Sequence, residues 1–337
     1  MQTKRYNKLL QNFYNSLVSA HQQFSKDRSQ HIAHLLYNLD ARTSFFQLQG
    51  LARIDTKISK HKKDAEKWLL HFKTLEDAFG KYDFWVALEE ICIQKKMDSK
   101  LISYLTTQKL IHLGLLEAAL LQSGWLVKEV DSYVVSDEPL KKFTKKFNKI
   151  AWLSHGKERK KLLKFLVEEI EEIRDKLSTG EIDLTQIEEG IHELRRKLRW
   201  LGIYSSALNG KIVFPEISKS HALSKYVTDK ALALKFNQLP NNLEEQEKVF
   251  FLPGAFILLG EIINDIGNIK DPALVTEELT KIANVIKLNK SSLNKKLGSD
   301  FMTHETAIKL TKKLMKEKLE KTALLDHTIS YFKQQLN

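Results

Sequence analysis

Cysteine is almost absent from this sequence, and its scarcity excludes two kinds of structure. Cys92 is the single cysteine among 337 residues, so neither an internal disulfide nor a zinc site built on cysteine pairs is possible. One lone thiol suits a reducing compartment. Because Cys92 lies in the apolar run ALEEICI, we expect a buried structural thiol rather than a nucleophile.

Glycine and proline are also scarce, and no long hydrophobic run occurs. With 13 glycines, 5 prolines and 28% charged residues, the composition favours a helical protein over a β protein. The longest apolar window, VFFLPGAFILLG, is interrupted by Pro253 and Gly254 and is too short to span a bilayer. The first residues, MQTKRYNKLL, lack the apolar centre of a signal peptide. We therefore expect a soluble cytoplasmic protein that does not enter a membrane.

Recognisable catalytic motifs are missing as well. The sequence contains no glycine-rich phosphate loop, no HExxH, no GxSxG and no Cys/His ligand spacing. His31 and His34 have a spacing that could hold a metal, but no carboxylate pair accompanies them. The glutamates of FLVEEIEEI lack the Glu-x-x-His partners of a di-metal bundle, which favours a solvated acidic face. We predict no metal, no cofactor and no catalysis, and we keep an enzyme with an unrecognised site as the third hypothesis.

What the sequence does have is an excess of positive charge. A formal net charge of +12 and a pI near 9.4 indicate a polyanionic partner such as nucleic acid, an anionic membrane or a phosphate polymer. No helix-turn-helix, zinc finger, RNA-recognition sheet or KH loop can be recognised. Nucleic acid therefore remains a weaker candidate than another polyanion.

The segment Ile191–Ile203, IHELRRKLRWLGI, concentrates this charge on a predicted helix. Apolar residues recur with helical spacing at Ile191, Leu194, Leu198 and Leu201. A neighbouring face carries four basic residues at i, i+3, i+4 and i+7: His192, Arg195, Arg196 and Arg199. Like charges at this spacing repel each other by a few tenths of a kcal/mol per pair. Such a face is either solvated or binds an anion.

The periodicity predicts an all-α protein. We expect helices at 4–20, at 29–48, within 57–80 up to Gly80, from Asp83 to Ile93 and after an Asp98 cap. Further helices are expected after Pro139, up to Leu177, after a Thr185/Glu188 capping box, from Leu243 to Ile266, from Asp271, and from Thr303 to Phe332. The Asp98 helix is apolar on most sides, so we expect it to be central. A loop or short strand is expected at 209–220. The predicted division is a first helical-bundle half at 1–124, a linker at 125–137 and a second half at 138–337.

Two motifs of the second half resemble those of the CHAD family, the conserved histidine α-helical domain. His192, Arg195 and Arg199 match its His-x-x-Arg-x-x-x-Arg/Lys pattern, and IGNIKD at 266–271 matches its Leu-Gly-x-x-Arg/Lys-Asp signature closely. The first half departs: His31 or His34 stands for the histidine, only Arg42 remains basic nearby, and FGKYD is one residue short. The resemblance implies two related antiparallel helical bundles that arose by internal duplication.

The same resemblance implies a function. Such a domain binds inorganic polyphosphate without catalysis, in a basic groove formed by the histidine- and arginine-bearing helices of both halves, and the protein would associate with polyphosphate granules. The implied site contains His31, His34, Arg42, His192, Arg195, Arg196, Arg199, Lys270, Lys312 and Lys316. Guanidinium groups bind phosphate oxygens in pairs, which suits this ligand. The alternative is a helical scaffold that binds a protein or nucleic acid and has lost the family's ligand. The sequence leaves the oligomeric state open.

Overall fold

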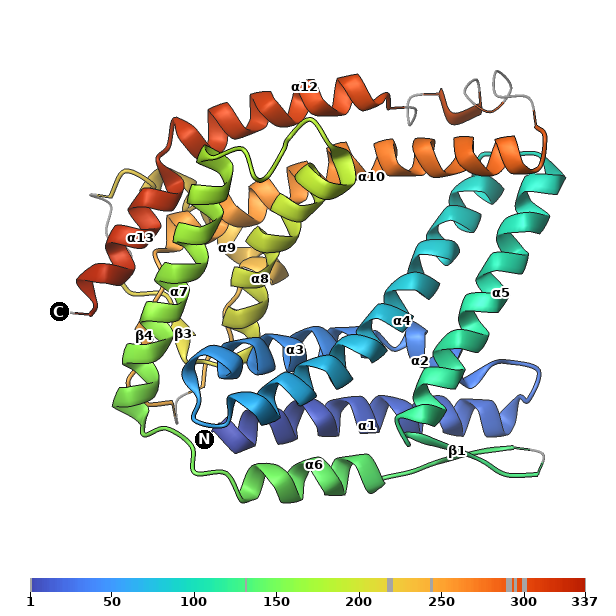
Figure 1. Cartoon of the computed structure of the whole chain (residues 1–337), viewed down its shortest axis with the longest axis horizontal. Coiled ribbons are helices and arrows are strands. Elements are labelled where there is room, and N and C mark those ends of the chain that lie inside the picture. Colours follow the sequence, from blue (N-terminus) through green and yellow to red (C-terminus); the bar gives the residue numbers. More distant parts are fainter. Residues whose placement is uncertain are drawn as a thin grey trace. The chain divides into compact units, whose positions relative to one another are not determined.

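The computed structural model describes residues 2–130, 132–216, 221–242, 245–288, 293, 296–298 and 302–336. The fold is all-α, as predicted, and the described strands are only two or three residues long (Figure 1). The chain divides into two compact units, Met1–Trp152 and Leu153–Asn337. Among the described helices, none combines the length and the apolar composition that crossing a bilayer requires.

The first unit contains six helices and one hairpin within its described residues. They are α1 (Gln2–Lys26), α2 (Ile32–Asn38), α3 (Ala41–Ile58), α4 (Lys62–Gln94), α5 (Ser99–Gln122), β1 (Leu126–Lys128), β2 (Tyr133–Val135) and α6 (Glu138–Asn148). The strands pair antiparallel, with Leu126 opposite Val135. The helical stripe of α1 is buried through Leu9, Leu10, Phe13 and Leu17, as its spacing predicts.

The second unit is also mostly helical. Its described elements are α7 (His155–Ser178), the π-helical η1 (Ile187–His192), α8 (Glu193–Ala207), β3 (Ile212–Val213), the 3-10 turn η2 (Ser224–Tyr226), α9 (Asp229–Ala233), the 3-10 turn η3 (Lys235–Asn237), β4 (Val249–Phe250), α10 (Pro253–Val285), α12 (His304–Leu314), the π-helical η5 (Met315–Glu320) and α13 (Leu324–Gln334). Strands β3 and β4 pair in parallel, with Ile212 opposite Val249. The predicted short strand within 209–220 is therefore present, while 217–220 lie outside the described residues.

Several local predictions are confirmed. The Asp98 carboxylate accepts a hydrogen bond from the Lys100 backbone amide at 2.8 Å and caps α5. Pro139 occupies the first turn of α6, where its missing amide hydrogen costs nothing. Cys92 is fully buried, and this burial raises the pKa of its thiol to about 11. The thiol therefore stays protonated near neutral pH, as a structural cysteine should.

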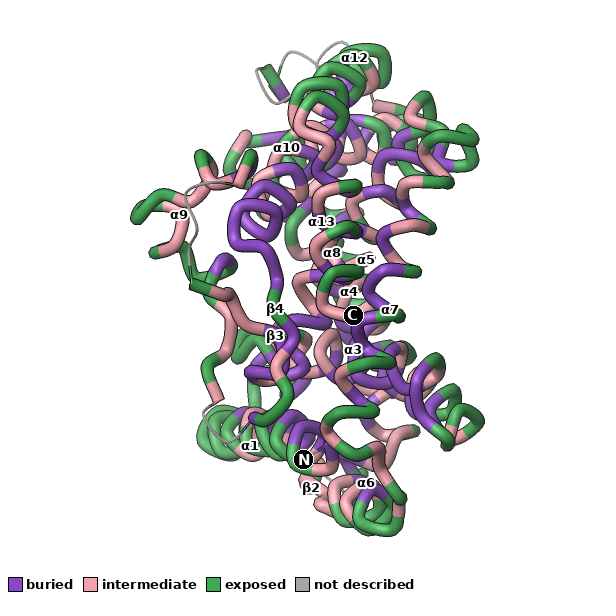
Figure 2. The backbone as a smooth tube through the Cα atoms, turned by 90° about the vertical axis from the view of Figure 1, so that its left-hand side faces the viewer, coloured by how far each residue is buried: buried purple, intermediate pink, exposed green. Residues whose placement is uncertain are grey.

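The predicted helix ends at Gly80 and Gly267 are wrong. Helix α4 continues through Gly80 and Asp83, and α10 continues through Gly267, Asp271 and Pro272. An interior glycine costs a helix only about 1 kcal/mol relative to alanine, which tertiary packing readily offsets. The start of α10 shows such packing, because residues 251–259 are all buried (Figure 2).

Other boundaries differ from the prediction for local reasons. The expected helix at 29–48 is split into α2 and α3 by Asp40, which adopts a left-handed φ of 54° that aspartate tolerates. The expected helix from Leu243 begins only at Pro253, after strand β4. The Thr185 hydroxyl bonds to Asp183 instead of forming a capping box with Glu188. Ala323, with φ of 45°, divides the expected 303–332 helix.

The units and α5 also differ from expectation. The unit boundary lies at Trp152, so the predicted linker at 125–137 is the β1–β2 hairpin and α6 lies in the first unit. Helix α5, expected to be central, leaves Leu110, Ile111 and Leu115 about half exposed. Its other side is buried through residues such as Leu105 and Leu116. When a helix is apolar on most sides, its sequence therefore does not show which side packs against the rest of the protein.

Candidate anion-binding site

The segment Ile191–Ile203 folds as predicted on its apolar side and differently at its start. Ile191, Leu194, Leu198 and Leu201 are all buried. His192 is the last residue of the π-helical segment η1, and α8 begins directly after it. Single π-helical turns cost stability and are frequent at functional sites. The basic residues of this segment therefore follow an irregular turn.

Arg195 reaches from α8 to the middle of α10. Its Nε donates a hydrogen bond to the backbone carbonyl of Ile263 at 3.1 Å. The guanidinium lies against Gly267, where an added Cβ would be 3.0 Å from Nη2 and 3.2 Å from Nε. Gly267 thus permits this close approach. No carboxylate of the described residues forms an ion pair with Arg195, so its positive charge is not neutralised there.

Lys270 comes to the same place from α10, one turn after Gly267. Its side chain is only 6% exposed, and its ammonium lies 2.6 Å from the Asp271 carboxylate. Burial lowers the pKa of His192, and the charges of Lys270, Arg196 and Arg195 lower it further, while Glu188 raises it. Because Arg195 lies against Gly267, one turn before Lys270, cations of α8 and α10 come together here. We call His192, Arg195, Arg196, Arg199 and Lys270 the α8–α10 basic cluster.

Acidic neighbours neutralise only part of this cluster. Arg196 forms an ion pair with Glu193 on its own helix, and 59% of the Arg196 side chain is exposed. Nε2 of His192 lies 3.9 Å from Glu188, and its Nδ1 is buried without a hydrogen-bond partner among the described residues. Arg199 follows one turn after Arg195 and is half-buried. Arg195 is therefore the member of the cluster whose positive charge no acid of the described residues neutralises.

The two late lysines of the predicted site have different surroundings. Lys312 on α12 is exposed and lies close enough to Asp183, just before η1, to help lower the pKa of that carboxyl; hydrogen bonds from Thr185 are the larger cause. Lys316 is exposed on η5, and no described contact joins it to the cluster. Lys318, two residues later, bonds to Glu261 and Asp265 on α10. Only Lys312 is thus shown to approach the η1 end of the site.

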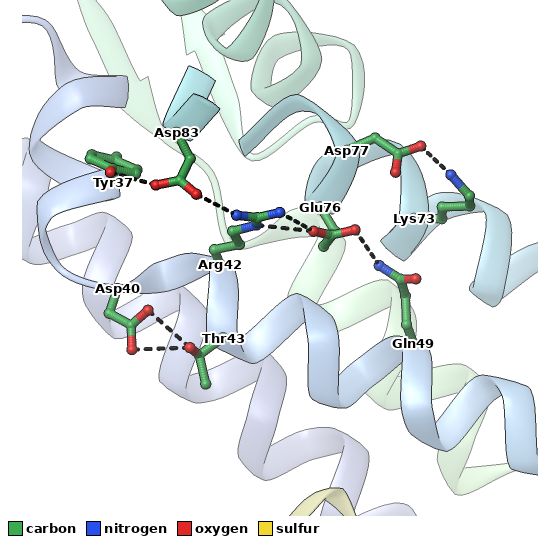
Figure 3. A network of polar contacts seen from close by, with 9 residues as sticks. All are labelled: Tyr37, Asp40, Arg42, Thr43, Gln49, Lys73, Glu76, Asp77 and Asp83. Atoms are coloured by element: carbon green, nitrogen blue, oxygen red, sulfur yellow. Dashed lines mark hydrogen bonds and ion pairs between the residues drawn. The ribbon is translucent and has the colours of Figure 1, made fainter. Parts of the chain in front are cut away.

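Arg42, the predicted basic residue of the first unit, is held by acids. Its Nε and Nη2 donate to Oε1 of Glu76 at 3.0 and 2.8 Å, and its Nη1 donates to Asp83 at 2.8 Å (Figure 3). Asp83 also accepts a bond from the Tyr37 hydroxyl at 2.7 Å. A Cβ at Gly80 would collide with the Arg42 guanidinium. Arg42 therefore has the same glycine contact as Arg195 but a neutralised charge.

The two histidines of the first unit also have internal partners. Nδ1 of His34 lies 2.7 Å from the Tyr82 hydroxyl, and burial is the main cause that lowers the pKa of His34. His31 lies 3.5 Å from Glu117. The residues predicted for the two halves fall in different units, and the structure describes each unit by itself.

One further group of ionisable residues lies in the second unit. His155, Glu158 and Glu245 place potential ligand atoms within 4.8 Å of one another. The fully buried Lys211 lies 3.7 Å from Glu158 and 3.5 Å from Glu245, and it donates to the Gln246 carbonyl at 2.7 Å. The ammonium group already supplies the positive charge that two buried carboxylates require. This group is best described as a buried ion cluster that joins α7 to the segment before β4.

Sequence reasoning found the basic residues of α8 but not what decides their charge state. Glu76 and Asp83 stand four residues before and three residues after Gly80, and only the packing of α3 on α4 brings them to Arg42. The equivalent positions around Gly267 hold Ile263 and Lys270. No family model, no curated protein and no solved structure matches this chain, so the resemblance to the CHAD family depends on the motif residues alone.

Proposed function

We propose that this chain binds inorganic polyphosphate at the α8–α10 basic cluster and does not catalyse a reaction on it. The observation that carries the proposal is the state of Arg195. Its guanidinium uses only Nε in a described hydrogen bond, to a neutral carbonyl, and has no carboxylate partner among the described residues. A half-buried guanidinium of this kind is a good partner for an anion that accepts two hydrogen bonds at once.

The surrounding residues favour a phosphate over a lone carboxylate. Lys270 and Arg196 add further hydrogen-bond donors beside Arg195, although Lys270 is paired with Asp271 and Arg196 with Glu193. A phosphate unit presents several oxygens, so it can accept bonds from more than one of these groups. Lys312, near the η1 end, extends the positive surface beyond the cluster, which suits a chain of phosphates better than a single one. Since polyphosphate releases counterions when it binds, the affinity should fall steeply with salt.

The decisive experiment compares two double charge reversals within the second unit. Arg195→Glu with Arg199→Glu should weaken the binding of long-chain polyphosphate by about a hundredfold or more, because two attractive contacts become repulsive. Lys230→Glu with Lys235→Glu changes the net charge equally, at exposed positions on α9 and η3 outside the cluster. This control should lose only the general electrostatic attraction, a few-fold in affinity. Circular dichroism should show the same helix content for both variants and the parent.

A salt series and a competitor define the ligand. The logarithm of the polyphosphate association constant should fall linearly with the logarithm of the salt concentration. DNA of equal total charge should compete poorly with polyphosphate for the protein. Equal binding by the Arg195/Arg199 variant and the control would remove the α8–α10 basic cluster from the site. DNA that competes as well as polyphosphate would favour the nucleic-acid scaffold instead. Release of phosphate from polyphosphate in the presence of Mg²⁺ would contradict the non-catalytic part of the proposal.

A further inference from the structure

A pocket of about 460 Å³ lies in the first unit, which the proposed polyphosphate site does not use. It is formed by the beginning of α4, the end of α5 and the first two turns of α6. Its walls include Trp68 and His71 from α4 and Phe143 from α6. A volume of this size is typical of pockets that hold small organic ligands.

Three lysines surround this pocket: Lys67 on α4, and Lys142 and Lys146 on α6. None of them forms an ion pair with an acid of the described residues. Glu138 is the single acidic residue in the described lining. Lys141, which is not part of the described lining, is the α6 lysine that pairs with Asp137 and Glu138. The pocket therefore carries an excess of positive charge at its rim.

The inner wall is aromatic and has polar groups without partners. The His71 ring lies 5.1 Å from Phe143, and Trp68 is 97% buried among the aromatic residues of the core. Nε1 of Trp68 and Nε2 of His71 are both buried without a hydrogen-bond partner in the described part of the unit. The indole group can only donate. Burial, followed by the charge of Lys142, lowers the pKa of His71, so its ring is neutral near pH 7.

We propose that this pocket binds a small phosphate ester that carries a planar ring, a molecule of nucleotide size. The lysines recognise the phosphate, and the aromatic wall of Trp68, His71 and Phe143 packs against the ring. A free phosphate ion would satisfy the rim but would leave most of the 460 Å³ and the aromatic wall unused. An uncharged ring would leave three ammonium groups without a counterion. A ligand with both parts matches the whole pocket.

The test uses the full chain and four probes in calorimetric titrations: adenosine monophosphate, phenyl phosphate, adenosine and inorganic phosphate. At least one of the two esters should bind saturably with one site per chain. Adenosine and inorganic phosphate should each bind at least about tenfold more weakly than that ester, because each lacks one of the two recognised parts. Quenching of tryptophan fluorescence gives an independent readout, since Trp68 forms part of the wall.

Helix α6 offers a matched pair of variants. Lys142→Ala with Lys146→Ala removes two pocket lysines, while Lys145→Ala with Lys149→Ala removes two lysines of the same helix that lie outside this pocket. Both pairs have i, i+4 spacing and change the net charge by the same amount. The first variant should weaken ester binding by about tenfold or more, and the second by less than about twofold.

Three results would overturn the proposal. They are the absence of saturable binding for both esters, equal binding of inorganic phosphate and the better ester, and equal losses in the two α6 variants. The last result would mean that general charge alone attracts the ligand. Because all four lysines are exposed, both variants should keep the parent's thermal unfolding curve. The outcome does not depend on the polyphosphate site, which lies in the other unit.

Discussion

In each unit, an arginine from one helix lies against a glycine within a helix of 33 residues: Arg42 at Gly80 of α4, and Arg195 at Gly267 of α10. The position four residues before the glycine is Glu76 in α4 and Ile263 in α10, and both supply the oxygen that the arginine contacts. In the first unit this oxygen belongs to a carboxylate. In the second it belongs to a neutral backbone carbonyl.

The position three residues after the glycine widens the difference. Asp83 adds a second carboxylate to Arg42, whereas the same position of α10 holds Lys270, whose ammonium pairs with Asp271 and leaves Arg195 without an acid. The same packing arrangement therefore produces a neutral structural contact in one unit and an uncompensated positive charge in the other. The residues four positions before and three positions after the glycine therefore decide whether the arginine is neutralised.

The largest effect that tests this comparison concerns stability. Arg42→Ala should lower the free energy of unfolding by about 2–3 kcal/mol, because Glu76, whose side chain is only 11% exposed, would keep a buried charge without its arginine partner. The expected loss is smaller than for breaking a fully buried ion pair, because 26% of the Arg42 side chain is exposed to solvent. Arg195→Ala, which removes no ion pair of the described residues, should cost less than about 1 kcal/mol. Urea unfolding curves of the parent protein and both variants measure these differences in the free energy of unfolding.

Binding should show the opposite order for the same two variants. Arg195→Ala should lose most of its polyphosphate affinity, and Arg42→Ala should retain that of the parent protein below its unfolding temperature. Equal stability losses would mean that the ion pairs of Arg42 contribute little. Equal binding losses would place Arg42 in the ligand site, despite its bonds to Glu76 and Asp83.

A smaller effect tests whether the glycine is needed for close approach. Gly80→Ala should destabilise the protein by about 1 kcal/mol, since the new methyl group displaces the Arg42 guanidinium and the lost ion-pair geometry outweighs the gain in helix propensity. Gly114→Ala is the control, because Gly114 lies in the interior of α5 with no atom within 4 Å of an added Cβ. That change should stabilise by about 0.5–1 kcal/mol. If both variants were stabilised, the arginine would have other positions of equal energy.

The sequence predicted what depends on spacing along one helix. The buried stripe Ile191, Leu194 and Leu198 and the basic residues beside it follow from a period of 3.6. Gly80 and Gly267 were predicted to end helices because glycine is common at C′ and the later Asp83 and Asp271 could each cap a new helix. In the folded chain each glycine instead provides room for an arginine that lies 38 or 72 positions earlier. Such a role depends on packing between helices, which periodicity does not contain.

The charge state of the candidate site was beyond prediction for the same reason. Glu76 and Asp83 lie 34 and 41 residues from Arg42 in the sequence, and their distance in space follows from how α3 packs on α4. Burial of Lys270 likewise results from its position on the α8-facing side of α10. The sequence identified which cations were present, but only their neighbours determine which remain available to an anion.

The smallest predicted effect is a pH dependence that only the second unit should show. His192 faces Arg195 and Arg196 of α8, Lys270 of α10 and Glu188 of η1, and burial together with these cations lowers the pKa of its imidazole from 6.5. Bound phosphate adds negative charge and raises that pKa, so the complex holds more protons than the free protein at pH values between the two. Polyphosphate affinity should therefore increase on the order of threefold as the pH falls from about 7.5 to about 5.5.

Two substitutions separate His192 from the other histidines. His192→Asn should remove the increase in polyphosphate affinity at low pH, and His61→Asn in the first unit should leave that increase unchanged. Long-chain polyphosphate is the right ligand, because its internal phosphates stay ionised over this range. The same lowered pKa makes folding less favourable as the pH falls below about 6.5, since the unfolded chain then binds the proton more readily. As the pH falls, polyphosphate affinity should thus rise while folding stability declines. The rise in affinity must therefore be measured on protein that remains folded at each pH. If polyphosphate affinity changed with pH in His192→Asn as it does in the parent protein, the imidazole would not face the bound phosphate, even if Arg195 does.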